Sequence, residues 1–304
     1  MNLLLTVIHY LLFPGFLFLS IAGLFISWVD RKLAARLQWR VGPPLFQPWY
    51  DIRKLFSKEL MIPEGGNETL FVLSPIVALL TLVYVGTELL LIWLVPGRSF
   101  PGDMFVFLYL LSVPSVCMMM GASASANPYA SLGASREMKL ILSYELPLLI
   151  CVIVAALKSH SMSLGTIIEH QHGWSNIFSL SGFVALIVSV ICIQAKMGMS
   201  PFDLSEAETE LAGGLFVEYS GPLLAVWKLV KMILMVVVPL YVIFIFWGSG
   251  PQVLLIAKYA FVITVALLLR ILSPRVRIDH ALLFFWRLLT PLSIAALLLA
   301  FVGV

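Results

Sequence analysis

Residues 200–221, the acidic stretch, contain the side chains whose types and spacing could move protons. This stretch holds five of the sixteen acidic residues of an otherwise apolar chain: Asp203, Glu206, Glu208, Glu210 and Glu218. On a helix, like charges four residues apart, such as Glu206 and Glu210, cost roughly 0.2–0.5 kcal/mol, so local stability does not explain them. Either basic groups lie opposite these carboxylates, or some of the carboxylates hold protons. Both alternatives indicate a function.

The acidic stretch also carries the signals of a short helix. Asp203 follows Pro201 and precedes Glu206 by three residues, the pattern of an N-cap aspartate with a glutamate in the first turn. Gly213-Gly214 is the matching stop signal. The sequence therefore predicts a helix that begins at Asp203 and ends before Gly213.

The rest of the chain must hold this stretch at a membrane. Of its 304 residues, 61% are hydrophobic and 12% are charged, whereas soluble domains are about 45–50% apolar and about 25% charged. We expect an all-α integral membrane protein with a single membrane domain, residues 1–304. Eight segments are long enough to be transmembrane helices, which need roughly 20 apolar residues each: residues 3–28, 70–95, 104–126, 138–157, 180–196, 222–247, 253–272 and 281–304.

Basic residues set the expected orientation of these eight helices. They cluster after the first span, at Arg31, Lys32, Arg36, Arg40, Arg53, Lys54 and Lys58, and alternate loops add Arg136, Lys139, Lys196, Arg270, Arg275 and Arg277. The positive-inside rule then predicts that the N-terminus and the C-terminus lie outside. Two large charged cytoplasmic loops, residues 29–69 and 197–221, follow helices one and five.

The first of these loops contains an amphipathic segment. Apolar residues repeat at helical spacing opposite charged ones: Trp49, Ile52, Phe56 and Leu60 against Asp51, Lys54 and Lys58. This pattern predicts a helix that lies in the membrane interface or under a partner protein. The alternative is a plain surface anchor attracted to anionic lipid.

Three of the charged residues inside the expected spans are candidates for a proton path. Glu145 precedes Pro147, which frees the carbonyl group of Ser143 and so creates a polar pocket where a carboxyl group could titrate. Lys228 and Lys231 lie one turn apart in the sixth span and are natural partners for carboxylates, including Glu145. We interpret Glu145 as part of a proton path; the alternatives are a structural hydrogen bond for Glu145 and lysines that reach the headgroups.

The last charged loop has an alternating pattern. Arg275, Arg277 and Asp279 follow Pro274 with one residue between successive charges. This pattern is either a topology signal alone or a counter-charge for the acidic stretch on the same face.

No part of the sequence indicates a catalytic or metal centre in this chain. Cys117, Cys151 and Cys192 lie singly in apolar segments, and their spacing fits no zinc, iron–sulfur or disulfide framework. Nucleotide-binding and nucleophile motifs are missing as well. We expect a membrane subunit without a cofactor of its own, which contacts lipid and protein but no nucleic acid.

Three blocks of sequence resemble one family in collinear order. RLQWRVGPPLFQPWYDIRKLFSKE, SPFDLSEAETELAGGLFVEYSG and SPRVRID are similar to loops of the complex I membrane subunit that forms the quinone site, the NADH dehydrogenase subunit 1 family. That family includes the equivalent subunits of group 4 membrane-bound [NiFe]-hydrogenases and formate hydrogenlyases. NPYASLGASREM looks like the hydrogenase version of its segment.

The resemblance implies partners and a place in a prokaryotic cytoplasmic membrane. The expected partners are a [NiFe]-hydrogenase-like large subunit, an iron–sulfur small subunit, a ferredoxin-like subunit and antiporter-like membrane subunits, with the [NiFe] centre and the clusters in those partners. The acidic stretch would line the junction with the peripheral arm, and Glu145, Lys228 and Lys231 would continue a hydrated path. Docking or counter-charge residues would be Arg36, Arg40, Asp51, Lys54, Arg275, Arg277 and Asp279.

Three alternatives to the hydrogenase-type complex stay open. The chain could be the quinone-site subunit of a complex I-like dehydrogenase, and only then would a quinone be bound. It could belong to a sulfur-reducing relative, whose membrane subunit would look nearly the same. A self-contained transporter would be expected to show internal repeat symmetry, which this sequence lacks.

Overall fold

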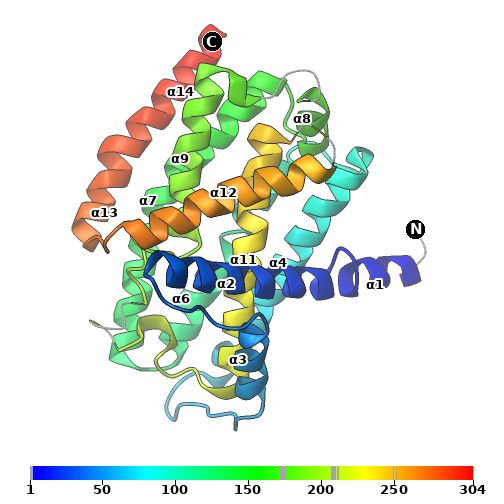
Figure 1. The fold of residues 1–304 in the computed structure, drawn as a ribbon. Helices are drawn as coiled ribbons and strands as arrows, with labels where there is room; N and C mark the ends of the chain where they lie inside the picture. Colours follow the sequence, from blue (N-terminus) through cyan, green and yellow to red (C-terminus); the bar gives the residue numbers. More distant parts are fainter. Residues whose placement is uncertain are drawn as a thin grey trace. The chain divides into compact units, whose positions relative to one another are not determined.

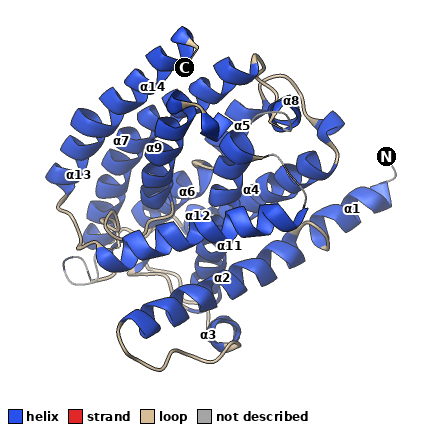
Figure 2. Cartoon of the chain, turned by 45° about the horizontal axis from the view of Figure 1, so that its top comes forward, coloured by secondary structure: helices blue, strands red, loops and turns tan. Residues whose placement is uncertain are grey.

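The computed structural model describes residues 3–171, 176–206, 210, 212–248, 250 and 252–303, and these residues form helices joined by loops without a strand (Figure 2). The expectation of an all-α protein is therefore confirmed. The helices follow in this order: α1 Leu3–Leu11, α2 Phe16–Leu37, α3 Gln47–Phe56, α4 Glu68–Leu94, η1 Pro96–Arg98, α5 Asp103–Leu110, α6 Val113–Ala124, α7 Pro128–Ser159, α8 Leu164–His170, η2 Asn176–Phe178, α9 Leu180–Lys196, η3 Gly214–Phe216, α11 Gly221–Trp247, α12 Gln252–Leu272, α13 Ile278–Phe284, the π-helical η4 Phe285–Leu289 and α14 Thr290–Val302.

Seven helical segments of the described residues are long and apolar enough to cross a membrane. They are Val7–Leu37, Glu68–Leu94, Asp103–Ala124, Pro128–Ser159, Gly221–Trp247, Val253–Leu272 and Ile278–Val302. The remaining expected span coincides with α9, which has only 17 residues and is about 26 Å long at 1.5 Å per residue. The number eight and the orientation with both termini outside stay predictions.

Contacts within the chain define two units, and each is described by itself. Unit 1 comprises residues 1–87, 111–138 and 203–237, and unit 2 comprises residues 88–110, 139–202 and 238–304. The acidic stretch from Asp203 onward belongs to unit 1. Glu145 belongs to unit 2.

Small residues allow close helix packing in unit 1. A Cβ atom on Gly23 of α2 would lie 2.9 Å from the carbonyl oxygen of Met232 in α11. Gly86 of α4 similarly faces the side chains of Leu19 and Val237. Such small residues are typical of membrane helix interfaces, where packing replaces the hydrophobic effect as the driving force.

Unit 2 is built around α9. This helix packs beside α14 and also contacts α12 (Figure 1). Aromatic rings fill the core of the unit at one end of α9, where the ring of Phe202 lies 4.9 Å from Phe285 and Tyr144 lies 6.4 Å from the same ring. The unit therefore packs Tyr144, the chain neighbour of Glu145, into this aromatic core.

Two helices extend further than the sequence predicts. The first expected span ends near residue 28, but α2 continues to Leu37, so Arg31 and Arg36 lie on a helix and not in the loop. No glycine or proline interrupts this segment, and Ala, Leu, Arg and Lys are good helix formers. The fourth expected span begins near residue 138, but α7 begins at Pro128.

The early start of α7 has a local cause. The side chain of Asn127 accepts a hydrogen bond of 2.8 Å from the backbone N–H of Tyr129, as an N-cap does. Pro128 occupies the first helical position, where its missing N–H is not needed. Residues 128–137, which precede the expected span, are therefore the first part of a long helix.

The predicted helix start at Asp203 is wrong. None of residues 203–206 is part of a helix. The stop signal holds, because Gly213 and Gly214 have φ angles of +104° and +53°, which favour glycine. Glu208 lies outside the described residues.

The amphipathic helix is present, but only Ile52 of its expected apolar face is buried. α3 ends at Phe56, before Leu60, and its buried side chains are Pro48, Ile52 and Leu55. Trp49 and Phe56 of the expected apolar face are about half exposed, at 52% and 51%. These two rings remain available to lipid or to a ligand.

Candidate functional site

Three carboxylates of the acidic stretch have polar partners within unit 1. Glu206 forms an ion pair with Lys231 of α11. Glu210 accepts a hydrogen bond of 2.6 Å from Arg136 of α7, and Glu218 accepts one of 2.5 Å from the amide of Asn127. Of the two explanations for clustered carboxylates, opposing basic groups therefore account for Glu206 and Glu210.

Glu137 of α7 joins this cluster, although no pattern in the sequence marks it as a site residue. Its side chain is buried, with 5% of the residue exposed. Ser115 and Ser205 hydrogen-bond to its carboxyl group, and it interacts electrostatically with Glu206 and Lys231. Reading Asn127-Pro128 as a helix start would have placed Glu137 on a helix with Arg136.

A cavity of about 410 Å³ lies beside the ion pair of Glu206. Its charged lining consists of Glu206, Lys228 and Lys231, and its aromatic lining consists of Phe216 and Trp227. The ammonium group of Lys231 also lies 5.0 Å from the centre of the Phe216 ring. A polar cavity of this size can hold several waters, which could bridge these charged groups and relay protons.

Glycines bring the backbone of the acidic stretch close to α7. A Cβ atom on Gly133 would lie 3.0 Å from the carbonyl oxygen of Ser205 and from the backbone nitrogen of Leu215. A Cβ on Gly214 would collide with the same carbonyl of Ser205. Because Ser205 also contacts Glu137, these glycines fix the distance between the two carboxylate-bearing segments.

Tyr219 anchors the far end of the acidic stretch. Its ring stacks on Phe71 with 4.1 Å between the ring centres, and its hydroxyl donates a hydrogen bond of 3.1 Å to the carbonyl of Phe71. Gly121 provides the space for this hydroxyl. Burial raises the pKa of Tyr219 to about 12, so the hydroxyl keeps its proton and remains a donor at neutral pH.

A second charged cluster ties α3 to α2. Arg31 donates a hydrogen bond of 2.6 Å to Asp51, and Gln47 donates one of 3.1 Å. Burial raises the pKa of Asp51, but these two hydrogen bonds and the charges of Arg31 and Lys228 outweigh it and hold the pKa below its usual value. The electrostatic influence of Lys228 reaches from the cavity to this cluster.

Other predicted docking residues lie at the surface of their own unit. Arg36, Arg40 and Lys54 are exposed in unit 1, and Arg277 and Asp279 are exposed in unit 2. Asp203 and Arg275 are half-buried. Because Arg275 and Arg277 belong to unit 2, their expected pairing with the acidic stretch stays a prediction.

Glu145 has a different lysine partner from those predicted. Its carboxylate lies 3.6 Å from the ammonium group of Lys196 at the end of α9, within unit 2. The same ammonium group lies 5.6 Å from the centre of the Tyr144 ring. Lys228 and Lys231 line the cavity of unit 1 instead. The sequence signal for Lys196 is its place at the last turn of an apolar segment.

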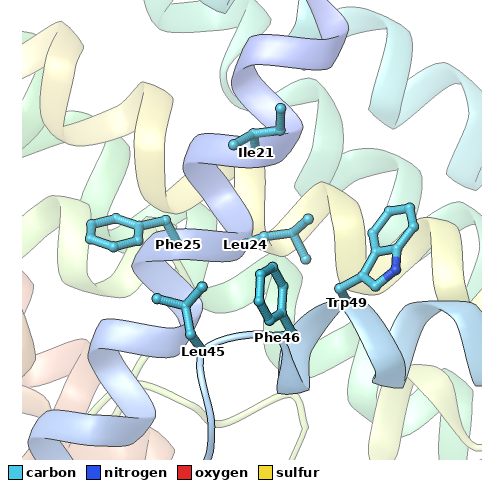
Figure 3. Close-up of a pocket in the computed structure, with 6 residues that line it drawn as sticks. All are labelled: Ile21, Leu24, Phe25, Leu45, Phe46 and Trp49. Carbon is cyan, nitrogen blue, oxygen red and sulfur yellow. The ribbon is translucent and has the colours of Figure 1, made fainter.

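An apolar cavity of about 410 Å³ lies between α2 and the start of α3 in unit 1 (Figure 3). Ile21, Leu24 and Phe25 of α2 form one wall. Leu45, Phe46 and Trp49 approach from the loop and from α3. Among the described residues that line it, none is charged, which suits a lipid chain or another apolar molecule.

Comparisons with known proteins find relatives along nearly the whole chain. The sequence matches the NADH dehydrogenase family over residues 9–301. It is 32% identical to an NADH-quinone oxidoreductase subunit of Syntrophobacter fumaroxidans, over 91% of this chain and 89% of that protein. It is also 32% identical to the corresponding NADH-quinone oxidoreductase subunit of Carboxydothermus hydrogenoformans, over 92% of this chain and 84% of that protein. A chain of an archaeal membrane-bound sulfane sulfur reductase has a TM-score of 0.80 and 25% identity, over 93% of this chain and 96% of that one.

Proposed function

The chain belongs to the NADH dehydrogenase family, the family of complex I subunit 1, and from this we propose that it is the membrane anchor and coupling subunit of a respiratory oxidoreductase complex. In this role it docks a peripheral redox arm and links electron transfer there to ion translocation in the membrane. Its location is the cytoplasmic membrane of a prokaryote, as a multi-pass subunit.

One observation carries this proposal. The buried Glu137 lies beside the Glu206–Lys231 ion pair, next to a polar cavity. A protein core built for stability alone gains little from buried charges, which are expensive unless paired. Coupled titratable groups around a cavity instead can pass a change of charge from one group to the next. We assign the coupling path in unit 1 to Glu137, Glu206 and Lys231.

Exposed charges support the docking role. Arg36, Arg40 and Lys54 give unit 1 exposed positive charges, and Glu210 of the acidic stretch, in the same unit, is 53% exposed. Exposed charges of both signs favour a partner with complementary charges and suppress wrong partners. The peripheral arm is that partner.

For the whole complex we propose a ferredoxin- or formate-linked reaction of the [NiFe]-hydrogenase type. The segment that carries Arg136 and Glu137 supports it, because NPYASLGASREM resembles the hydrogenase form. The [NiFe] centre and iron–sulfur clusters would then reside in large and small partner subunits, with a ferredoxin-like subunit and antiporter-like subunits completing the complex. This chain would bind none of those groups.

A quinone-linked dehydrogenase is the second candidate. The names of both bacterial relatives support it, since each is a subunit of an NADH-quinone oxidoreductase. The apolar cavity lined by Phe25, Phe46 and Trp49 also suits an apolar headgroup or tail. A third candidate, a sulfur-reducing complex, rests on the archaeal sulfane sulfur reductase whose chain shares the fold.

Purification of a tagged chain with its partners distinguishes these candidates. Stoichiometric nickel together with hydrogen production from reduced ferredoxin or formate supports the hydrogenase type. A nickel-free complex that retains quinone supports the second candidate, and substitution of Leu24 by Trp, which fills the apolar cavity, should then remove the quinone. A complex with iron–sulfur clusters but neither nickel nor quinone supports the third. A chain that purifies alone would contradict the coupling role itself.

A further inference from the structure

A second polar cavity, of about 470 Å³, lies in unit 2 at the end of span α7. Basic side chains reach it from two helix ends: Lys158 and His160 from the end of α7, and His170 from the end of α8. Leu157 and the last residues of α14, Ala300 and Phe301, form an apolar wall. Among the described residues that line this cavity, none is acidic.

His160 has a positive φ angle, which is uncommon for a residue with a Cβ atom. The N–H of Ser161 donates to the carbonyl of Ala156 and the N–H of His160 donates to that of Leu157, both at 3.3 Å, which together form a Schellman motif. His160 occupies the left-handed position of this motif, with φ +49°. Glycine or asparagine is the usual residue there because a Cβ is disfavoured. A strained residue that points a titratable ring to a cavity suggests a function.

Two of these three basic residues have a structural role that needs no ligand. Lys158 and His170 lie in the last turns of their helices, where cations offset the helix dipole. A helix-stabilising role alone does not explain His160, because glycine would end α7 with less strain. His160 also lines the cavity, so its ring is available to a group bound there.

We infer that this cavity binds the phosphate headgroup of an anionic phospholipid. Lys158, His160 and His170 supply hydrogen-bond donors for phosphate oxygens, and the ammonium group supplies a positive charge. The apolar wall next to them continues along α14, where Leu298 and Phe301 are exposed at 60% and 69%. Acyl chains can lie on this surface while the headgroup occupies the cavity. A free phosphate would make no use of the apolar wall.

Lipid retention by the purified complex tests this inference. The complex, in a non-ionic detergent, is incubated with equal amounts of phosphatidylglycerol and phosphatidylcholine, and the retained lipid is measured by mass spectrometry. Preferential retention of phosphatidylglycerol is expected. The Lys158→Gln variant should retain it roughly fivefold less, as expected for one basic residue at a lipid surface. His280→Gln, which changes an exposed histidine of α13, is the matched control and should retain it fully.

His160→Gly separates ligand binding from helix stability. Glycine adopts the left-handed backbone freely, so this variant should unfold at the same or a higher temperature but retain less phosphatidylglycerol. Equal retention of both lipids, or unchanged retention in both Lys158→Gln and His160→Gly, would overturn the inference. Displacement of the lipid by glycerol phosphate as effectively as by phosphatidylglycerol would overturn the assignment to a lipid.

Discussion

The carboxylate of Glu145 lies 3.6 Å from the ammonium group of Lys196, and the two partners of this ion pair differ in burial. The side chain of Lys196 is 1% exposed, whereas that of Glu145 is 29% exposed. The protein thus encloses nearly the whole lysine side chain, whereas part of the glutamate side chain stays uncovered. Within unit 2, the lysine depends more on its partner than the glutamate does.

This asymmetry predicts unequal effects of removing either partner. Glu145→Gln should destabilise the complex by about 3 kcal/mol, because it removes the counter-charge of a buried ammonium group. Lys196→Met should destabilise it less, because the remaining carboxylate is partly exposed. Thermal unfolding of the purified complex measures both, and the double variant should recover part of the loss. Equal destabilisation by the two single changes would contradict this picture.

The coupling proposal predicts a loss of ion translocation without a loss of assembly. Glu206→Gln and Glu137→Gln change charge but not bulk, so the complex should still assemble. Coupled ion uptake into vesicles should fall about 10²-fold, the lower end of the effect of a positioned proton-transfer group. Glu64→Gln, on an exposed loop residue, is the control. Unaltered uptake in both variants would refute the coupling role, and failed assembly would favour a docking role.

Glu210→Gln tests the docking side of the same cluster. It weakens the hydrogen bond to Arg136 without changing bulk. Because Glu210 is half exposed, we expect a small change in folding stability, below about 1 kcal/mol. Coupled activity should nevertheless fall if the arm contacts this pair. Assembly is followed by size-exclusion chromatography and activity by ion uptake; normal values of both would remove Glu210 from the site.

The close packing of Gly214 against Ser205 within the acidic stretch predicts a sharp steric effect at this glycine. Gly214→Ala would place a Cβ against the carbonyl of Ser205 at a positive φ angle. It should destabilise unit 1 by about 2–4 kcal/mol, from strain and overpacking together. Gly65→Ala is the matched control, since Gly65 has φ +83° but open space around it. Gly65→Ala should cost only about 1 kcal/mol. A similar cost for Gly214→Ala would contradict the close packing of Gly214 against Ser205.

The lowered pKa of Asp51 predicts how pH affects the attachment of α3. A carboxylate with a depressed folded-state pKa contributes stability above its unfolded value, about 3.9, and loses it as pH falls through the folded value. Hydrogen exchange in α3 should therefore vary little between pH 5 and pH 8 beyond its intrinsic pH dependence. Asp51→Asn should speed the exchange about fivefold at all these pH values, because it should lower the free energy of opening of α3 by about 1 kcal/mol. Lys54→Gln, on the exposed face of α3, should leave it unchanged.

Hydropathy predicted the helices well because a bilayer forces apolar segments into helices. Every expected span has a helix in the structure, and α9 and the residue range 180–196 coincide. The boundaries failed where a span continues beyond the apolar part. Composition indicates where the chain crosses the bilayer, but local backbone structure sets the helix ends: Asn127 caps the start of α7, and Trp39 adopts a left-handed conformation, φ +58°, after the end of α2.

The candidate site was predicted in part. The acidic stretch and its two lysines were found by charge in an apolar chain, and Lys231 does contact Glu206. Glu137 was missed because its significance comes from burial against Ser205, a contact between segments far apart in the sequence. The partner of Glu145 was missed for the same reason, since no pattern along one helix identifies the facing lysine.

Asn127 caps α7 with its amide oxygen and donates from its amide nitrogen to Glu218. Loss of this amide by spontaneous deamidation would create a carboxylate that repels Glu218 and no longer donates. That reaction ordinarily begins when the backbone nitrogen of the following residue attacks the side chain and closes a cyclic imide. Here the following residue is Pro128, whose nitrogen carries no hydrogen. Pro128, the first residue of α7, therefore also protects Asn127 from deamidation.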